Sequence, residues 1–176
     1  MHMIPRLVIA ATQSGSGKTT IVTGLLAALR ARGVRVQSFK VGPDYIDPGY
    51  HQLASGRPGH NLDTWLVPAA KVPAIFAAES AEADIAIIEG VMGLFDGTPS
   101  AAELARRLGL PILAVIDGAS MAASFGAIAY GLKHYQAGTP LQAAFANRVG
   151  SAHHADLLEK SLPPDIAWYG ALPRDA

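Results

Sequence analysis

Residues 10–20 read Ala10-Ala11-Thr12-Gln13-Ser14-Gly15-Ser16-Gly17-Lys18-Thr19-Thr20, a glycine-rich segment between a short apolar run and a long periodic one. Gly15 and Gly17 allow backbone N–H groups to turn inward onto phosphate oxygens, at a helix N-terminus whose partial positive charge favours anions. Lys18 is then placed to reach the β and γ phosphates of a nucleotide, and the Thr19 hydroxyl to contact Mg²⁺. The segment therefore predicts a P-loop, although the strict pattern G-x-x-x-x-G-K-[ST] has glycine where this chain has Thr12. The alternative is a plain Gly-rich turn before a helix.

Outside this segment, short apolar runs alternate with helical patterns. The runs are nearly uninterrupted, which is typical of strands buried on both faces and hence of a parallel sheet. Strands are expected at residues 7–11, 34–39, 84–89, 111–116, 141–147 and 166–170, and helices at 19–32, 69–80, 100–108, 120–135 and 152–162. Segment 41–67 shows neither pattern and is expected to be a long functional or mobile loop, the candidate lid of the site. With right-handed crossovers, this order predicts an α/β, three-layer P-loop NTPase-like fold with a mostly parallel central sheet.

Composition narrows the class of protein. The chain has 176 residues, 50% hydrophobic and 16% charged, with 14 Lys plus Arg, 14 Asp plus Glu and no cysteine. One domain with a single core is expected. Zero net charge argues against a nucleic-acid partner, and the lack of cysteine excludes disulfides, Cys-ligated zinc and a thiolate nucleophile within this chain. No apolar stretch reaches the ~18 residues that span a bilayer, so a cytoplasmic protein without a membrane partner is expected.

Charged residues follow two of the expected strands. Glu89 ends the third strand, and a carboxylate at a buried strand end needs a cation, such as the metal of a P-loop site. Lys40, Asp44 and Asp47 follow the second strand, at the sheet edge where open α/β sheets bind ligands. Two acids and a lysine suit metal coordination and charge stabilisation in phosphoryl transfer. The alternatives are that Gly-Pro-Asp and Asp-Pro-Gly form turns only, and that Glu89 is an exposed loop residue.

Three further positions lie at loops or strand ends. Asp63 stands near Trp65, where it could cap a helix start, and Asp96 precedes a glycine with which it could form a turn. Asn147 and Arg148 end the fifth strand, where they could read the edge of a base or begin a helix-capping segment.

Several segments are more specific together than any one of them alone. They are residues 12–19 (TQSGSGKT), 40–48 (KVGPDYIDP), 61–63 (NLD), 89–97 (EGVMGLFDG) and 147–151 (NRVGS). This combination resembles the synthetase domain of the cobyrinic acid a,c-diamide synthase family, over nearly the whole chain.

The resemblance implies a carbon–nitrogen ligase of cobalamin biosynthesis. Such an enzyme uses Mg-ATP to convert the a and c acetate carboxylates of cobyrinic or hydrogenobyrinic acid to acyl phosphates, which ammonia displaces. The implied nucleotide-binding residues are Thr12, Ser14, Gly15, Ser16, Gly17, Lys18, Thr19, Thr20, Asn147 and Arg148. The implied Mg²⁺ ligands are Thr19, Asp47 and Glu89, and the implied catalytic residues are Lys18, Lys40, Asp44, Asp47 and Glu89. The residues expected to contact the corrinoid substrate are Tyr45, Asp63, Asp96 and Arg57. Arg57 is expected to bind one of its carboxylates, so replacement of Arg57 is expected to raise the substrate KM.

Two other groups share this type of P-loop. Dethiobiotin synthetases also activate a carboxylate with ATP, whereas partitioning-type ATPases use ATP to switch dimerisation and carry an extra lysine where this chain has Gln13. Full-length members of the corrinoid family carry a second, glutaminase domain with a cysteine nucleophile. The resemblance thus implies that residues 1–176 are a single ATP-binding synthetase domain, C-terminally incomplete, that receives ammonia from a glutaminase domain or subunit. Homodimerisation is left open.

Overall fold

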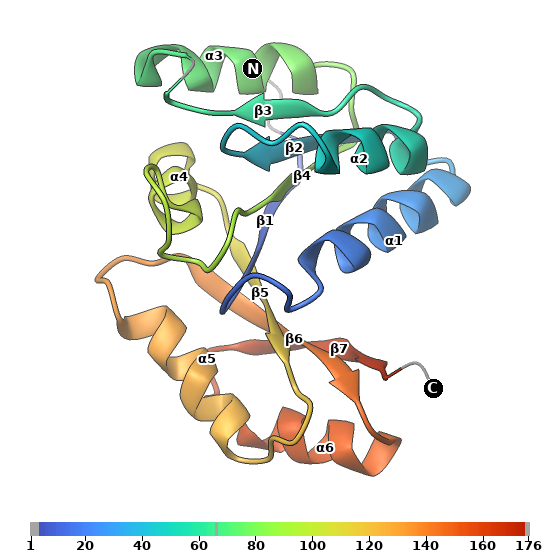
Figure 1. Cartoon of the computed structure of the whole chain (residues 1–176), viewed down its shortest axis with the longest axis vertical. Coiled ribbons are helices and arrows are strands. Elements are labelled where there is room, and N and C mark those ends of the chain that lie inside the picture. The colour runs from blue at the N-terminus through green and yellow to red at the C-terminus, as the bar shows by residue number, and fades with distance from the viewer. Residues whose placement is uncertain (1–3, 66, 175–176) are drawn as a thin grey trace.

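The computed structural model describes residues 4–65 and 67–174, and its centre is a twisted parallel sheet (Figure 1). Within these residues the sheet has seven strands in the order β3-β2-β4-β1-β5-β6-β7, and every neighbouring pair is parallel. The strands are β1 (Arg6–Ala11), β2 (Val36–Val41), β3 (His60–Leu62), β4 (Ile85–Glu89), β5 (Ile112–Asp117), β6 (Leu141–Val149) and β7 (Ala167–Pro173). Every residue of β2 is buried, as expected for a strand that is covered on both faces.

Helices form a layer on each side of the sheet. α1 (Lys18–Ala31) and α2 (Asp47–Ser55) lie on one face, to the right of the sheet in Figure 1. The other face is covered by α3 (Val72–Ser80), which follows the short 3-10 helix η1 (Ala69–Lys71), and by α4 (Ala101–Leu108), α5 (Ser124–His134) and α6 (Ala152–Ser161). The expected α/β, three-layer class with a parallel sheet is therefore confirmed.

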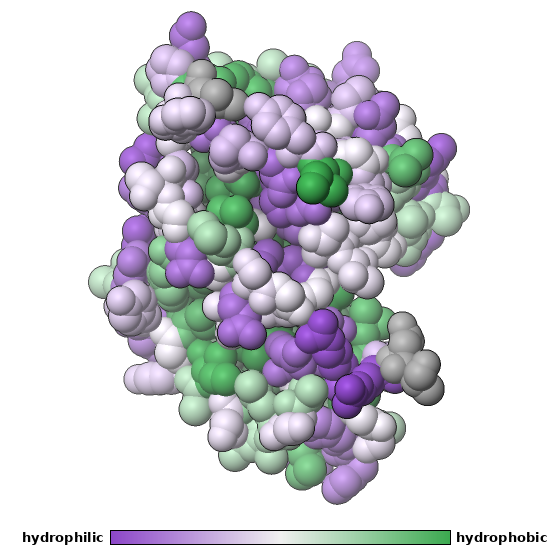
Figure 2. Space-filling model, viewed as in Figure 1, coloured by the Kyte–Doolittle hydropathy of each residue, from purple (hydrophilic) through white to green (hydrophobic). Residues whose placement is uncertain are grey.

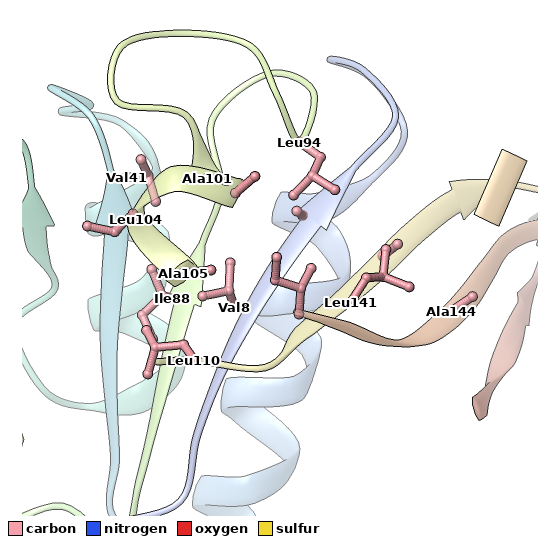
Figure 3. Packing of buried hydrophobic residues seen from close by; sticks show 14 of the residues in the cluster. Val8, Val41, Ile88, Leu94, Ala101, Leu104, Ala105, Leu110, Leu141 and Ala144 are labelled. Atoms are coloured by element: carbon pink, nitrogen blue, oxygen red, sulfur yellow. The ribbon is translucent and has the colours of Figure 1, made fainter. Parts of the chain in front are cut away.

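The packing of α4 fixes the middle of the sheet (Figure 3). Ala101, Leu104 and Ala105 of α4 belong to the same buried cluster as Val8 of β1 and Ile88 of β4, and each of the five is at most 1% exposed. The two alanines keep this side of the helix small, so that it packs closely against the strands. The P-loop begins at the carboxyl end of β1, and Glu89 is the last residue of β4. The packing of α4 thus supports the two strands that position them.

Segment 41–67, expected to be a long loop, instead contains α2 and β3, so that expectation is wrong. Pro48 lies in the first turn of α2, where the missing N–H of proline costs no helical hydrogen bond. The sequence Asp47-Pro48-Gly49 therefore starts a helix rather than forming only a turn. β3 has three residues, too few for a periodic pattern. Leu66, in the same segment, lies outside the described residues.

Other element boundaries differ by a few residues. The strand expected at 34–39 lies at Val36–Val41, and the helix expected at 120–135 begins at Ser124. Ser120, at the start of the expected helix, has a φ of 60°, which belongs to the left-handed region and is incompatible with a right-handed helix.

The contact between α5 and α6 leads to a stability prediction. A Cβ at the buried Gly126 would lie 1.8 Å from the Ser161 carbonyl oxygen, whereas one at the exposed Gly131 of the same helix would meet nothing within 4 Å. Gly126→Ala is expected to lower the free energy of unfolding by about 3 kcal/mol or more, since backbone must move. Gly131→Ala is the matched control and is expected to raise it by about 0.5–1 kcal/mol. Urea unfolding followed by circular dichroism measures both, and equal midpoints would contradict this packing.

Candidate nucleotide and metal site

The P-loop connects β1 to α1 at the carboxyl edge of the sheet. Gly15 and Gly17 adopt φ values of 78° and 93°, which only glycine adopts without strain. A Cβ at Gly17 would in addition lie 2.2 Å from the Asn147 side-chain nitrogen. Helix α1 begins directly afterwards, at Lys18, so its free N–H groups and positive end face the same space. The local geometry is that of a phosphate cradle.

Oxygen atoms of three side chains converge beside this cradle. The Thr19 hydroxyl donates to Glu89 Oε1 at 2.7 Å and lies 3.3 Å from Asp47 Oδ2. Lys40 bridges the two acids, since its ammonium donates to Asp47 Oδ2 and, at 3.0 Å, to Glu89 Oε1. Lys40 and Glu89 are also direct partners in the register of β2 and β4. The sheet itself therefore brings these residues together.

Lys40 and Glu89 form a buried pair of opposite charges. Burial alone would raise the pKa of Glu89, but hydrogen bonds from His51 and Thr19 and the charge of Lys40 hold it below its ordinary value. Burial likewise opposes the charge on Lys40, yet Glu89 and Asp47 raise the pKa of this amine above its ordinary value. The side chain of Lys40 is 4% exposed and that of Glu89 is fully buried. Their charges stabilise one another in a low-dielectric environment.

Lys18 lines a pocket between the P-loop and the acids Asp47 and Glu89. Its ammonium donates to the carbonyl oxygens of Met92 at 2.6 Å and Gln13 at 3.3 Å. Burial, followed by the nearby charge of Lys40, lowers its pKa, although Asp96 and the other acids oppose this. Met92 has a φ of 47°, an uncommon conformation for a residue with a side chain. The pocket has a volume of about 260 Å³ and is lined by Ser14, Gly15, Gly17, Lys18, Thr19, Lys40, Asp44, Asp47, Glu89, Val91 and Met92.

The segment before α2 presents exposed side chains next to the pocket. Asp44 Oδ1 accepts hydrogen bonds from the N–H groups of Ile46 and Asp47, at 2.8 and 3.1 Å, and so holds the start of α2. Burial would raise the pKa of Asp44, but these N–H groups and Lys40 hold it below its ordinary value. Tyr45 and Ile46 are 82% and 71% exposed. The side chains of Tyr45 and Ile46 are thus exposed to solvent beside the pocket, just before α2 begins.

Asn147 and Arg148 both bind the P-loop backbone. The Asn147 side-chain nitrogen donates to the Ser16 carbonyl at 2.9 Å, and Arg148 donates to the Gly15 carbonyl at 3.0 Å and pairs with Asp117 at the end of β5. The capping alternative for Asn147 and Arg148 is wrong, because the cap of α6 is Ser151, whose hydroxyl accepts the His154 N–H. Asp117 was not anticipated from the sequence.

Thr12 and Thr20, both expected to bind the nucleotide, lie at the two ends of the P-loop segment. The Thr12 hydroxyl lies 3.3 Å from that of Ser16, inside the loop, and Thr20 is exposed in the first turn of α1. Thr12 therefore stabilises the conformation of the loop, in a position where the strict pattern has glycine.

Two of the expected substrate residues, Asp96 and Asp63, lie in different surroundings. Asp96 accepts the Gly93 N–H at 2.9 Å and lies close enough to Lys18 to affect its pKa. Asp63 is 3% exposed and accepts the Trp65 N–H at 2.9 Å in a turn; in the described residues no helix begins at Trp65, so the helix-cap alternative is wrong. Neither side chain lines the pocket.

Arg57 does not join the cluster. Its guanidinium donates to the Gln37 side chain at 3.0 Å. Gln37 and Lys40 are separated by an odd number of positions along β2, so their side chains lie on opposite faces of the sheet. Arg57 therefore lies away from Lys40 and Glu89, and its expected contact with the corrinoid substrate stays a prediction.

His51 was not identified from the sequence. It lies on α2, four residues after Asp47, and its Nε2 is 2.7 Å from Glu89 Oε2. Both side chains are fully buried. The only local signal was the spacing of Asp47 and His51, and it has meaning only if residues 47–55 form a helix.

The donor set suits Mg²⁺ bound together with phosphate. In the described residues no group of three or more His, Cys, Asp or Glu side chains is arranged for a metal. The Thr19 hydroxyl and two carboxylates are all hard oxygen ligands, however, and they leave coordination positions for phosphate oxygens and water, as Mg²⁺ prefers. Among the residues 4–65 and 67–174, no helix has the length and apolar character needed to cross a membrane.

Comparison with known proteins gave three kinds of match. The family model CbiA, described as the CobQ/CobB/MinD/ParA nucleotide binding domain, matches residues 7–176. The hydrogenobyrinate a,c-diamide synthase of Pseudomonas aeruginosa is 55% identical over 98% of this chain and 40% of its own length. The cobyrinate a,c-diamide synthase of Syntrophotalea carbinolica is 49% identical over 90% of this chain and 36% of its own length. This chain therefore spans well under half of these relatives.

Solved structures of low sequence identity have the same fold. The signal recognition particle receptor FtsY from Elizabethkingia anophelis in complex with GDP has a TM-score of 0.64 at 18% identity, over 99% of this chain and 59% of FtsY. The hydrogenase maturation factor HypB from Archaeoglobus fulgidus has a TM-score of 0.62 at 12% identity, over 95% of this chain and 81% of HypB. These likenesses concern the fold alone.

Proposed function

Because the chain belongs to the CobQ/CobB/MinD/ParA nucleotide-binding domain family, we propose that it is the ATP-dependent synthetase part of a cobyrinate or hydrogenobyrinate a,c-diamide synthase. The observation that carries this proposal is the convergence of Thr19, Asp47 and Glu89 beside a P-loop whose rim is formed by the start of α2. The identity to enzymes named for this reaction supports the choice of substrate.

In this proposal the P-loop N–H groups and Lys18 bind the ATP phosphates. Thr19, Asp47 and Glu89 would hold Mg²⁺, which supplies charge neutralisation at the phosphates when bound. In the part of the chain that the structure describes, the hydrogen-bond partners of Lys18 are two backbone carbonyls, so it can turn toward a phosphate without breaking an ion pair. Lys40 stays paired with both acids and keeps their net charge low.

The corrinoid carboxylate would enter beside Asp44 and Tyr45. An oxygen of that carboxylate attacks the γ phosphorus, the bond to the β-γ bridging oxygen breaks, and ADP leaves. Ammonia then attacks the carbonyl carbon of the acyl phosphate, loses one proton and expels phosphate to leave an amide.

The exposed Tyr45 and Ile46 would give the macrocycle an apolar surface next to the reacting carboxylate. Figure 2 shows that hydrophobic residues on the visible face are scattered among hydrophilic ones.

Ammonia would come from a glutaminase. The relatives are about two and a half times as long as this chain, because it covers 40% of the first of them. We place the glutaminase in that additional length or in a separate subunit.

Mass spectrometry of products tests the proposal. The chain is incubated with cobyrinic or hydrogenobyrinic acid, Mg-ATP and an ammonium salt, with glutamine as the nitrogen source in a parallel reaction. A diamide formed with ammonium and not with glutamine is the expected result. Ring closure of a diaminononanoate substrate would instead identify a dethiobiotin synthetase, and ATP-dependent dimerisation in light scattering without any amide product would identify a switch ATPase.

A further inference from the structure

We propose that His51 is a positioning residue that holds the Glu89 carboxylate in the one orientation in which a single oxygen, Oε1, faces the divalent cation. This inference rests on the proposed function, since it concerns the metal ligands of the same site. It assigns a role to a fully buried residue of α2.

The two oxygens of Glu89 have separate partners. Oε1 accepts hydrogen bonds from Thr19 at 2.7 Å and from Lys40 at 3.0 Å, and so belongs to the open side of the cluster. Oε2 is 2.7 Å from His51 Nε2, on the buried side. The hydrogen bond to the imidazole therefore keeps Oε2 from rotating toward the pocket. Glu89 is left with one oxygen for the cation, in a fixed direction.

The burial of His51 supports a role directed at Glu89 alone. The ring is fully buried, and its Nδ1 has no hydrogen-bond partner among the described residues. A buried ring nitrogen without a partner destabilises the fold, and a leucine would fill this space without that cost. Within residues 4–65 and 67–174, the one polar contact of the ring is that to Glu89, so the contact to this carboxylate is what a histidine adds at this position.

The placement of His51 on α2 joins two ligands of the site. Asp47 and His51 lie four residues apart on the helix, and so on the same face of it. Asp47 contributes its own carboxylate, and His51 fixes that of Glu89 on β4. Supporting groups of this kind, which orient a metal ligand without touching the metal, usually change metal affinity 10- to 100-fold when they are replaced.

Mn²⁺ binding measured by electron paramagnetic resonance, with a non-hydrolysable ATP analogue present, tests the proposal. His51→Leu is expected to weaken Mn²⁺ binding ~10-fold or more. His51→Gln can still donate a hydrogen bond to Oε2 and is expected to restore most of the affinity. Gln52→Leu, at the exposed neighbouring position on α2, is the control and should bind Mn²⁺ like the wild type. Binding of a fluorescent ATP analogue in EDTA should be equal in all four proteins.

The outcomes separate this inference from the function. Unchanged Mn²⁺ affinity in a folded His51→Leu variant would overturn the inference, as would equal losses in His51→Leu and His51→Gln, because then the hydrogen bond is not what matters. If wild-type protein makes no corrinoid amide while His51→Leu still loses Mn²⁺ affinity and His51→Gln regains it, the proposed function fails and the role of His51 stands.

Discussion

Glu89→Gln is expected to lower Mg²⁺-dependent turnover by at least ~10²-fold, with Asp47→Asn close behind it. The amide keeps the shape of Glu89 but lacks the charge that a divalent cation and the Lys40 ammonium require. Metal ions stabilise the charge of phosphoryl transfer by several kcal/mol, and each ~1.4 kcal/mol corresponds to a factor of ten in rate. The Mg²⁺-dependent gain in the affinity for a fluorescent ATP analogue, measured on this chain, should disappear in the same variants.

A matched substitution elsewhere controls for the change from acid to amide. Glu103→Gln alters a partly exposed side chain of α4 that pairs with Arg107, four residues later. It is expected to leave both turnover and Mg²⁺-dependent ATP binding at the wild-type level. Wild-type Mg²⁺ dependence in folded Glu89→Gln and Asp47→Asn proteins would remove these residues from the metal site.

Lys40→Met is expected to lower the free energy of unfolding at pH 7 by about 3–5 kcal/mol, the usual effect of removing one partner from a buried ion pair. Lys40 is 3% exposed and is the cation that lies between Asp47 and Glu89. Without it, the two carboxylates remain close together and lose the ammonium that bridges them. Urea unfolding of the variant and the wild type measures the difference.

The loss should depend on pH in a defined direction. In the wild type, the pKa of Glu89 is lowered below 4.5 and that of Lys40 is raised above 10.5, so the stability from these two groups is constant between those values. In the variant, Lys40 no longer lowers the pKa of Glu89, whereas burial still raises it. The variant therefore gains stability as the pH falls from 8 to 5, and its difference from the wild type shrinks. A difference that grows over this range would contradict the assignment.

Magnesium ions give an independent check on the same variant. A cation between Asp47 and Glu89 would partly replace the missing ammonium, so Mg²⁺ should raise the unfolding temperature of Lys40→Met more than that of the wild type. Equal shifts in the two proteins would mean that Mg²⁺ does not bind between these carboxylates.

Features of this molecule with a local signature could be predicted from the sequence. The P-loop and the strands next to it follow from glycine spacing and uninterrupted apolar runs, because a strand covered on both faces needs apolar residues at every position. The convergence of Lys40, Asp47 and Glu89 also followed, since parallel strands direct their carboxyl ends to one edge. In the structure, Lys40 lies within hydrogen-bond distance of both Asp47 and Glu89.

What could not be predicted depends on contacts distant in the sequence. His51 contacts Glu89, 38 residues away, and nothing next to His51 marks it as part of a site. His51 reaches Glu89 because residues 47–55 form the helix α2. The sequence did not predict this helix, because Pro48 and Gly49 also favour turns. Arg57 had a charge suited to a carboxylate substrate, but β2 turns its partner Gln37 to the other face of the sheet. Sequence alone does not give the face on which a loop residue finds its partner.

The register of β2 against β4 also bears on misfolding. Lys40 and Glu89 are opposite one another in that register, and a slip of β2 by one residue would turn Lys40 to the other face of the sheet. The Glu89 carboxylate would then be buried without its cation, at a cost of several kcal/mol. Alternative pairings of the central strands are thus disfavoured by the charged pair itself. The same charged pair therefore disfavours incorrect pairing of β2 with β4 and forms part of the ligand-binding edge.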